Sequence, residues 1–144
     1  MLIAIIGESC VGKSSFAEIL SKELSAEVYT GKDYLRLAKN ETIARRLFEK
    51  KLVSAVAGEH LIYVISEKEH LSLLPGGTVK VLMTADLALI LDRFTQRMRG
   101  NLPEPVRSML ERKHHCFDEG IYDYRIHNCE NVEDLCQKIC GMAG

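Results

Sequence analysis

Gly7-Glu8-Ser9-Cys10-Val11-Gly12-Lys13-Ser14 matches the G-x-x-x-x-G-K-[ST] pattern of a phosphate-binding loop at every fixed position. In such a loop the glycines let backbone N–H groups close around phosphates, the lysine reaches the β- and γ-phosphates, and the final hydroxyl ligates Mg²⁺. We therefore expect residues 7 to 14, together with Ser15, to bind a nucleoside triphosphate. Lys13 would have a catalytic role, and Ser14 would be the metal ligand.

The residues on either side of the loop fit the strand and the helix that this motif requires. Residues 2–6 are a short apolar run typical of a buried strand. After the loop, apolar side chains recur at helical spacing at Phe16, Ile19, Leu20 and Leu24. A helix that begins here would place its N-terminus under the phosphates.

The length and composition are those of one globular domain. The chain has 144 residues, of which 47% are apolar and 27% charged, and its net charge is −1. This balance gives no whole-chain reason to expect a nucleic acid or a membrane as partner, and no apolar run approaches the length of a membrane span. The five cysteines form no C-x-x-C pair, so we expect a reducing, cytoplasmic location. The sequence leaves monomer and homodimer open.

Basic residues gather in two segments. Residues 32–51 carry seven basic and three acidic side chains, and residues 92–113 carry six and three. An anionic ligand would be drawn to these segments rather than to the whole surface. His114-His115-Cys116 offers metal-ligating side chains, but adjacent residues of one helix point in different directions, which disfavours a shared metal.

Strand-like and helix-like patterns alternate along the chain. Apolar strand-like runs lie at residues 2–6, 26–30, 61–65, 79–83 and 122–127. Helical patterns follow the loop, then cover about 41–56, 67–74 behind a Ser66–Glu69 capping box, and segments that begin at Asp86, at Pro103 (reaching Phe117) and at Asn131. This alternation predicts one α/β domain over residues 1–144, a three-layer P-loop NTPase fold with a five-stranded, mostly parallel sheet. Its ligand would bind at the carboxyl ends of the strands.

The stretch Thr30-Gly31-Lys32-Asp33-Tyr34-Leu35-Arg36 follows the second predicted strand and resembles nucleoside monophosphate kinases. Adenylate kinases carry Thr-Gly-Asp-x-Leu-Arg at this place, and Lys32 is one extra residue here. The resemblance implies that Arg36 holds the anionic group of the acceptor and that Asp33 orients it, within an acceptor segment over about residues 31–58. The alternative makes Asp33 a helix cap and Arg36 a solvated helix residue.

A series of arginines follows the fourth predicted strand. Phosphoryl transfer spreads negative charge over the transferred group, and arginine suits this group because it stays charged and presents a bidentate fork. Residues 91–112 are similar to the lid of guanylate kinases, and Tyr122-Asp123-Tyr124-Arg125-Ile126-His127-Asn128 is similar to the strand that follows that lid. The resemblance implies a short helical lid over about residues 93–112, with catalytic Arg93, Arg97, Arg107 and Arg112. For Arg107, an exposed i,i+4 pair with Glu111 is the alternative.

Two features depart from these kinase families. Their third strand usually ends with an aspartate that supports Mg²⁺, whereas Leu61 to Ile65 run into Ser66-Glu67 here. Either Glu67 acts through water or Ser66 is only a helix cap. The short chain also leaves no room for a guanylate-kinase-type base-recognition lobe. The acceptor and the preference between ATP and GTP therefore stay open.

Together these patterns predict an ATP-dependent phosphotransferase that moves the γ-phosphoryl group of Mg·ATP to a small acceptor, with a nucleoside monophosphate favoured. One alternative is a kinase of small hydroxylated molecules, like shikimate or gluconate kinases, in which Asp33 would accept a hydrogen bond from the hydroxyl. The other is a nucleotide-binding regulatory module without turnover.

Overall fold

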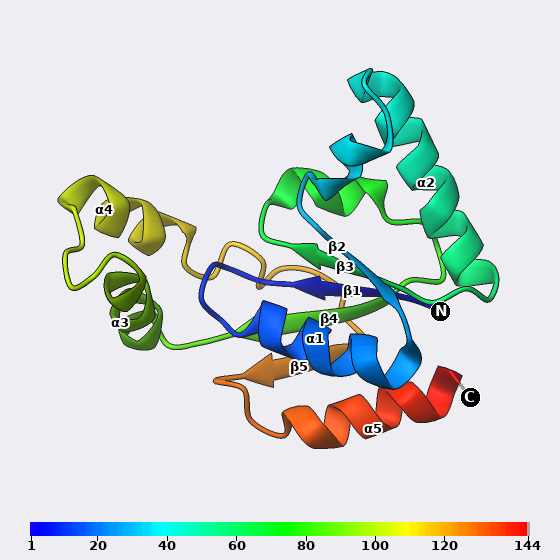
Figure 1. The fold of residues 1–144 in the computed structure, drawn as a ribbon. Helices are drawn as coiled ribbons and strands as arrows, with labels where there is room; N and C mark the ends of the chain where they lie inside the picture. The colour runs from blue at the N-terminus through cyan, green and yellow to red at the C-terminus, as the bar shows by residue number, and fades with distance from the viewer. Residues whose placement is uncertain (144) are drawn as a thin grey trace.

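The centre of the structure is a parallel β-sheet, shown in Figure 1 for a computed structural model that describes residues 1–143. Its strands are β1 (Leu2–Ile6), β2 (Glu27–Thr30), β3 (Leu61–Ile65), β4 (Val79–Thr84) and β5 (Tyr124–His127). They lie in the order β2-β3-β1-β4-β5, and every pair is parallel. The predicted five-stranded α/β fold is therefore confirmed, with a sheet that is parallel throughout.

Helices cover both faces of this sheet because the strand side chains alternate between two apolar clusters. The helices are α1 (Lys13–Leu24), α2 (Glu41–Ala57), α3 (Leu87–Arg97), α4 (Glu104–Lys113) and α5 (Val132–Ala143), with short 3-10 helices η1 (Asp33–Leu37) and η2 (Lys68–Leu73). Ile3 and Ile5 pack with α1 and α5 on one face, whereas Leu2, Ala4 and Ile6 pack with α2 and η2 on the other. These are the three layers of the predicted architecture.

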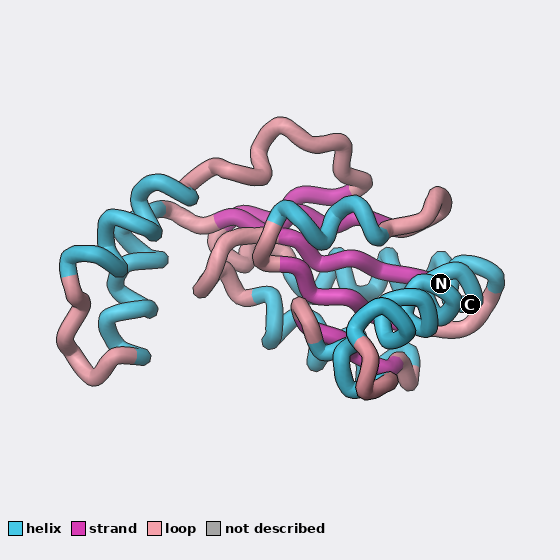
Figure 2. Tube along the Cα trace, turned by 90° about the horizontal axis from the view of Figure 1, so that it is seen from above, coloured by secondary structure: helices cyan, strands magenta, loops and turns pink. Residues whose placement is uncertain are grey.

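The pair α3 and α4 forms a helical hairpin that projects past the carboxyl ends of the central strands, as Figures 1 and 2 both show. Helix α3 follows β4, and the chain returns to β5 after α4. The hairpin therefore lies at the edge of the sheet where a parallel α/β fold binds its ligand. Within residues 1–143, no helix combines the length and the apolar character needed to cross a bilayer.

Three local predictions were wrong. The segment after β3 is a 3-10 helix, and the position that caps it is Glu67 without a side-chain bond, so the expected Ser66–Glu69 capping box does not form. The helix expected to carry Phe117 ends at Lys113, and Phe117 instead packs in the cluster under α2. Strand β5 begins two residues later than predicted, at Tyr124.

Candidate functional site

The predicted phosphate-binding loop joins β1 to α1, and its glycines lie where no side chain fits. A Cβ at Gly7 would collide with the main-chain oxygen of Met83 in the neighbouring strand β4. Gly12 has a φ of +97°, and a Cβ built on it would stand 2.5 Å from the Sγ of Cys129. Both motif glycines are thus required by close packing, against strand β4 and against the segment that follows β5, as well as by the turn itself.

We expect Gly12→Ala to lower the free energy of unfolding by about 3 kcal/mol, since backbone strain and overpacking both apply. Gly31→Ala is the matched control because Gly31 also has a positive φ, +54°, but open space around it. Its loss should be only about 1 kcal/mol. Urea-induced unfolding measures both, and Cys129→Ala should recover part of the Gly12→Ala loss. Equal losses at the two glycines would contradict a role for the sulfur contact.

Lys13 is folded back onto the loop with only 6% of its surface exposed. Its Nζ donates hydrogen bonds to the main-chain oxygens of Gly7, at 2.7 Å, and of Glu8. Burial lowers the pKa of Lys13 to about 8. A bound phosphate would supply the negative charge that stabilises this ammonium group, so the position is suited to an anionic ligand.

A cavity of about 160 Å³ opens directly above the loop at the carboxyl ends of the strands. The residues that line it are Ser9, Cys10, Gly12, Lys13, Ser14, Ser15, Thr30, Val64, Ser66 and Arg97. Five of them carry hydroxyl groups: Ser9, Ser14 and Ser15 in the loop and the start of α1, Thr30 in β2 and Ser66 at the end of β3. Lys13 and Arg97 bring positive charge. The cavity thus combines oxygen donors of the kind that Mg²⁺ prefers with cations suited to phosphate oxygens.

The two residues after β3 have different surroundings. Ser66 lines the cavity and does not occupy the cap position of η2, which is Glu67. The carboxylate of Glu67 instead accepts hydrogen bonds from the Nζ of Lys113, at 3.1 and 3.3 Å, and binds η2 to the end of α4. No local pattern links Glu67 to Lys113, because the two residues lie 46 positions apart.

The predicted arginines divide into two groups. Arg93 Nη1 donates to the main-chain oxygen of Cys10 in the loop at 2.8 Å, and Arg97 lines the cavity. In contrast, Arg107 forms the exposed pair with Glu111, at 3.2 Å, and Arg112 Nε donates to the Ser108 oxygen of its own helix at 3.3 Å. The fold brings the two α3 arginines to the loop and leaves the two α4 arginines bonded along α4.

Asp33 and Arg36 lie in η1, next to the end of β2. Asp33 Oδ2 accepts a hydrogen bond from the Thr30 N–H at 2.9 Å and so closes the turn that leads into η1. The guanidinium carbon of Arg36 lies 4.3 Å from the centre of the Tyr29 ring. Both side chains are exposed, and neither is among the residues that line the cavity above the loop.

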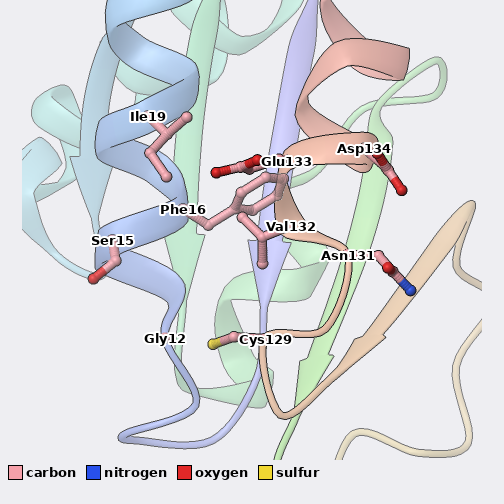
Figure 3. A pocket seen from close by; sticks show the side chains of 9 residues that line it. All are labelled: Gly12, Ser15, Phe16, Ile19, Cys129, Asn131, Val132, Glu133 and Asp134. Carbon is pink, nitrogen blue, oxygen red and sulfur yellow. The ribbon is translucent and has the colours of Figure 1, made fainter.

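A second cavity, of about 470 Å³, lies between α1 and the start of α5. Its lining consists of Gly12, Ser15, Phe16, Ile19, Cys129, Asn131, Val132, Glu133 and Asp134, all labelled in Figure 3. Glu133 extends toward α1, whereas Asn131 and Asp134 point away from it (Figure 3). Gly12 and Ser15 line both cavities, so this one lies next to the cavity above the loop. No sequence motif predicted that the residues after β5 would line a cavity. The one indication was the general rule that ligands bind at the carboxyl ends of the strands.

Comparisons with known proteins are informative at the level of structure. Neither a protein-family model nor a curated protein matches this chain. Among solved structures, an uncharacterized protein from Eubacterium ventriosum has a TM-score of 0.67 and 16% sequence identity, over 99% of this chain and 98% of that chain. Shikimate kinase from Acinetobacter baumannii, in complex with shikimate, has a TM-score of 0.60 and 19% identity, over 98% and 91%.

A third similar structure is the YorR protein from Bacillus subtilis in complex with phosphorylated GDP. It has a TM-score of 0.60 and 18% identity, over 99% of this chain and 95% of that chain. At these identities the similarity is one of fold, and the chain has the fold of P-loop kinases over its whole described length.

Proposed function

We propose that the protein is an ATP-dependent phosphotransferase that passes the γ-phosphoryl group of Mg·ATP to a small acceptor, with a nucleoside monophosphate as first candidate. The observation that carries this proposal is the meeting of Lys13 and Arg97 at one cavity above the loop. Phosphoryl transfer asks little covalent chemistry of a protein, and cations held around the transferred group stabilise its charge. A module that only binds nucleotide does not need an arginine beside the γ-phosphate to stabilise the charge of a transferred group.

The donor phosphates are the first part of the mechanism. The loop amides and Lys13 would hold the β- and γ-phosphates, and Ser14 would hold Mg²⁺, with Thr30 and Ser66 as further oxygen donors in the same cavity. When bound, the metal ion would neutralise charge on the phosphate oxygens. Arg97 would stabilise the transferred group. No general base is needed if the acceptor is itself a phosphate.

The α3–α4 hairpin would act as the lid of this site. Its closure would exclude water, which otherwise competes with the acceptor for the phosphoryl group. Arg93 would hold the loop in shape through the Cys10 oxygen. Arg107 and Arg112 would reach the transferred group only in a larger closure that breaks their present bonds on α4, so Arg97 is the arginine we assign to that group.

The nucleoside of the donor would occupy the cavity between α1 and α5, since this cavity adjoins the loop at Gly12 and Ser15. Phe16 and Val132 give it apolar walls. The carboxylate of Glu133, which extends toward α1, can accept a hydrogen bond from an amino group of the base (Figure 3).

Arg36 and Asp33 are the proposed acceptor-side residues. The exposed guanidinium of Arg36, stacked on Tyr29, can bind a phosphate or a carboxylate in bidentate fashion. A hydroxylated acid is the second candidate acceptor, because the fold is shared with a shikimate kinase that holds shikimate. Asp33 would then accept a hydrogen bond from the reacting hydroxyl.

Nucleotide binding should weaken as the pH rises above 8. The pKa of Lys13 is about 8 without a ligand, and phosphates beside it would raise that value, so binding above pH 8 must take up a proton. We expect the affinity for Mg·ADP to be about tenfold lower at pH 9 than at pH 7. Calorimetric titration in buffers of different ionisation enthalpy would show uptake of close to one proton at pH 9. An affinity that is constant from pH 7 to 9 would contradict the assignment to Lys13.

The proposed function is tested by coupled ADP release with Mg·ATP against three acceptor panels: nucleoside monophosphates, nucleosides and small hydroxy acids. Lys13→Ala serves as the blank. Acceptor-dependent release that disappears in the blank supports a kinase and identifies the acceptor class. ATP binding without turnover on any panel would overturn the proposal in favour of the regulatory module.

A further inference from the structure

Glu8, the first variable residue of the loop, has a buried side chain that the motif does not explain. Only 7% of the residue is exposed. Its Oε1 lies 3.0 Å from the Nδ1 of His114, and its Oε2 accepts the main-chain N–H of His115 at 3.2 Å. A carboxylate only accepts hydrogen bonds, so this contact is a hydrogen bond in the tautomer of His114 that carries the hydrogen on Nδ1. Both carboxylate oxygens of Glu8 are therefore bonded to the segment directly after α4.

This placement differs from what the sequence predicted for these residues. His114 and His115 lie beyond the end of α4, and they turn to different partners: His114 to Glu8 and His115 to Asp118, at 2.8 Å. Glu8 was expected to contact nucleotide as part of the loop. Its side chain is instead absent from the lining of the cavity above the loop, while its main chain stays within the loop.

The main chain and the side chain of Glu8 thus connect two parts of the molecule. Its carbonyl oxygen accepts the bond from Lys13 Nζ, and its carboxylate holds His114. A bound phosphate would draw the Lys13 ammonium away from the Glu8 carbonyl oxygen. Because the carboxylate of the same residue holds His114, this change in the main-chain contact of Glu8 would reach the end of α4. The first helix of the hairpin is bonded to the same loop, because Arg93 in the middle of α3 donates to the Cys10 oxygen. The hairpin is therefore attached to the phosphate-binding loop from α3 and from the segment directly after α4.

We propose that the Glu8–His114 pair anchors the α3–α4 lid to the phosphate-binding loop and transmits phosphate binding to the position of the lid. Both side chains are positioning residues, because they act through the lid and not on the substrate. The ligand-dependent part of this proposal rests on the proposed nucleotide binding. The anchor itself does not, because it is present in the protein without ligand. Leaving a buried carboxylate without its hydrogen-bond donor costs free energy, so we expect the Glu8–His114 contact to persist.

The test is hydrogen exchange followed by mass spectrometry over residues 93–113, with three substitutions. His114→Leu removes the donor, His114→Asn keeps an N–H donor at about the place of Nδ1, and His115→Leu is the matched control. The control reports on the neighbouring ring: His115 bonds Glu8 only through its main chain, its exposed side chain pairs with Asp118, and its ring centre lies 3.8 Å from that of His114. In the protein without ligand, the backbone amides of residues 104–113 should exchange about tenfold faster in His114→Leu than in the wild type. His114→Asn and His115→Leu should exchange at about the wild-type rate.

Addition of Mg·ADP gives the second measurement. Exchange over residues 93–113 should slow in the wild type, in His114→Asn and in His115→Leu. In His114→Leu it should stay fast although the nucleotide still binds with an affinity within about threefold of the wild type. This pattern, with rescue by asparagine, is one that a general loss of stability would not give. Glu8→Gln, which keeps the shape but weakens the acceptor, should shift exchange in the same direction and serves if His114→Leu fails to fold.

Equal exchange in His114→Leu and His115→Leu, or an Mg·ADP response that His114→Leu retains, would overturn the anchor. Equal hydrogen exchange over residues 93–113 in Glu8→Gln and in the wild type would overturn the anchor independently. Absence of phosphotransfer to any acceptor, combined with faster exchange in His114→Leu, would remove the proposed function but leave the anchor standing. The two proposals can therefore fail separately.

Discussion

Lys13→Ala is expected to lower acceptor-dependent turnover by at least about a thousandfold, or about 4 kcal/mol of transition-state stabilisation. The reason is geometric. The Nζ of Lys13 is held inside the loop by two main-chain oxygens, and the side chain lines the cavity in which the phosphates would bind. No movement of the backbone is needed to bring this cation to a phosphate. Steady-state kinetics at saturating ATP measure the loss.

Lys22→Ala is the matched control, because Lys22 is on the same helix but is exposed and pairs only with Glu18 across one turn. Its turnover should remain within about twofold of the wild type. Lys13→Ala should also keep or raise the melting temperature, since burial disfavours the charge that is removed. A Lys13→Ala protein that keeps more than about a tenth of the wild-type turnover would contradict the proposed catalytic role of Lys13.

The fold was predictable because local and global signals agree along most of the chain. Apolar runs of five residues separated by helical periods allow few architectures, and the loop motif fixes the first strand, turn and helix. The errors fall where tertiary contacts override a local pattern. Phe117 has helical spacing from α4, but it packs under α2 on the far side of the sheet. Nothing in a local window could reveal that the chain leaves the helix at Lys113.

The candidate site was predictable only where a motif sets both spacing and chemistry. The loop residues from Ser9 to Ser15 gather as expected, apart from the Val11 side chain, which is buried in the core. Ser66 and the Glu8–His114 pair could not be assigned, because each depends on which segments the sheet order brings together. Glu8 and His114 are 106 residues apart, and neither belongs to a pattern that names the other.

The arginines of the hairpin also show that a sequence pattern does not tell which side chain reaches the candidate site, and here an experiment can decide. Five arginines lie within residues 93–112, and sequence alone gave them equal standing. The hairpin turns only one of them, Arg97, into the cavity above the loop. This proximity has an electrostatic consequence: burial lowers the pKa of Lys13 most, and the positive charge of Arg97 lowers it further.

Arg97→Ala should therefore reduce kcat by about a hundredfold with little change in the KM for ATP, because the guanidinium acts mainly on the charge that develops in the transition state. Arg107→Ala is the matched control: Arg107 lies on the other helix of the hairpin, half exposed and paired with Glu111. Its kcat should change by less than about twofold. Arg97→Lys, which keeps the charge but not the fork, should fall between them, about tenfold down.

A second readout separates the loss of Arg97 from a general disturbance of the lid. Without the Arg97 charge, the pKa of Lys13 should move up, since one of its two causes of lowering is gone. The pH above which Mg·ADP binding weakens should rise in Arg97→Ala and stay unchanged in Arg107→Ala. If both variants lose kcat equally, or if both leave that pH unchanged, Arg97 is not the cation that faces the phosphates. The catalytic charge would then have to come from the α4 arginines after a larger closure of the hairpin.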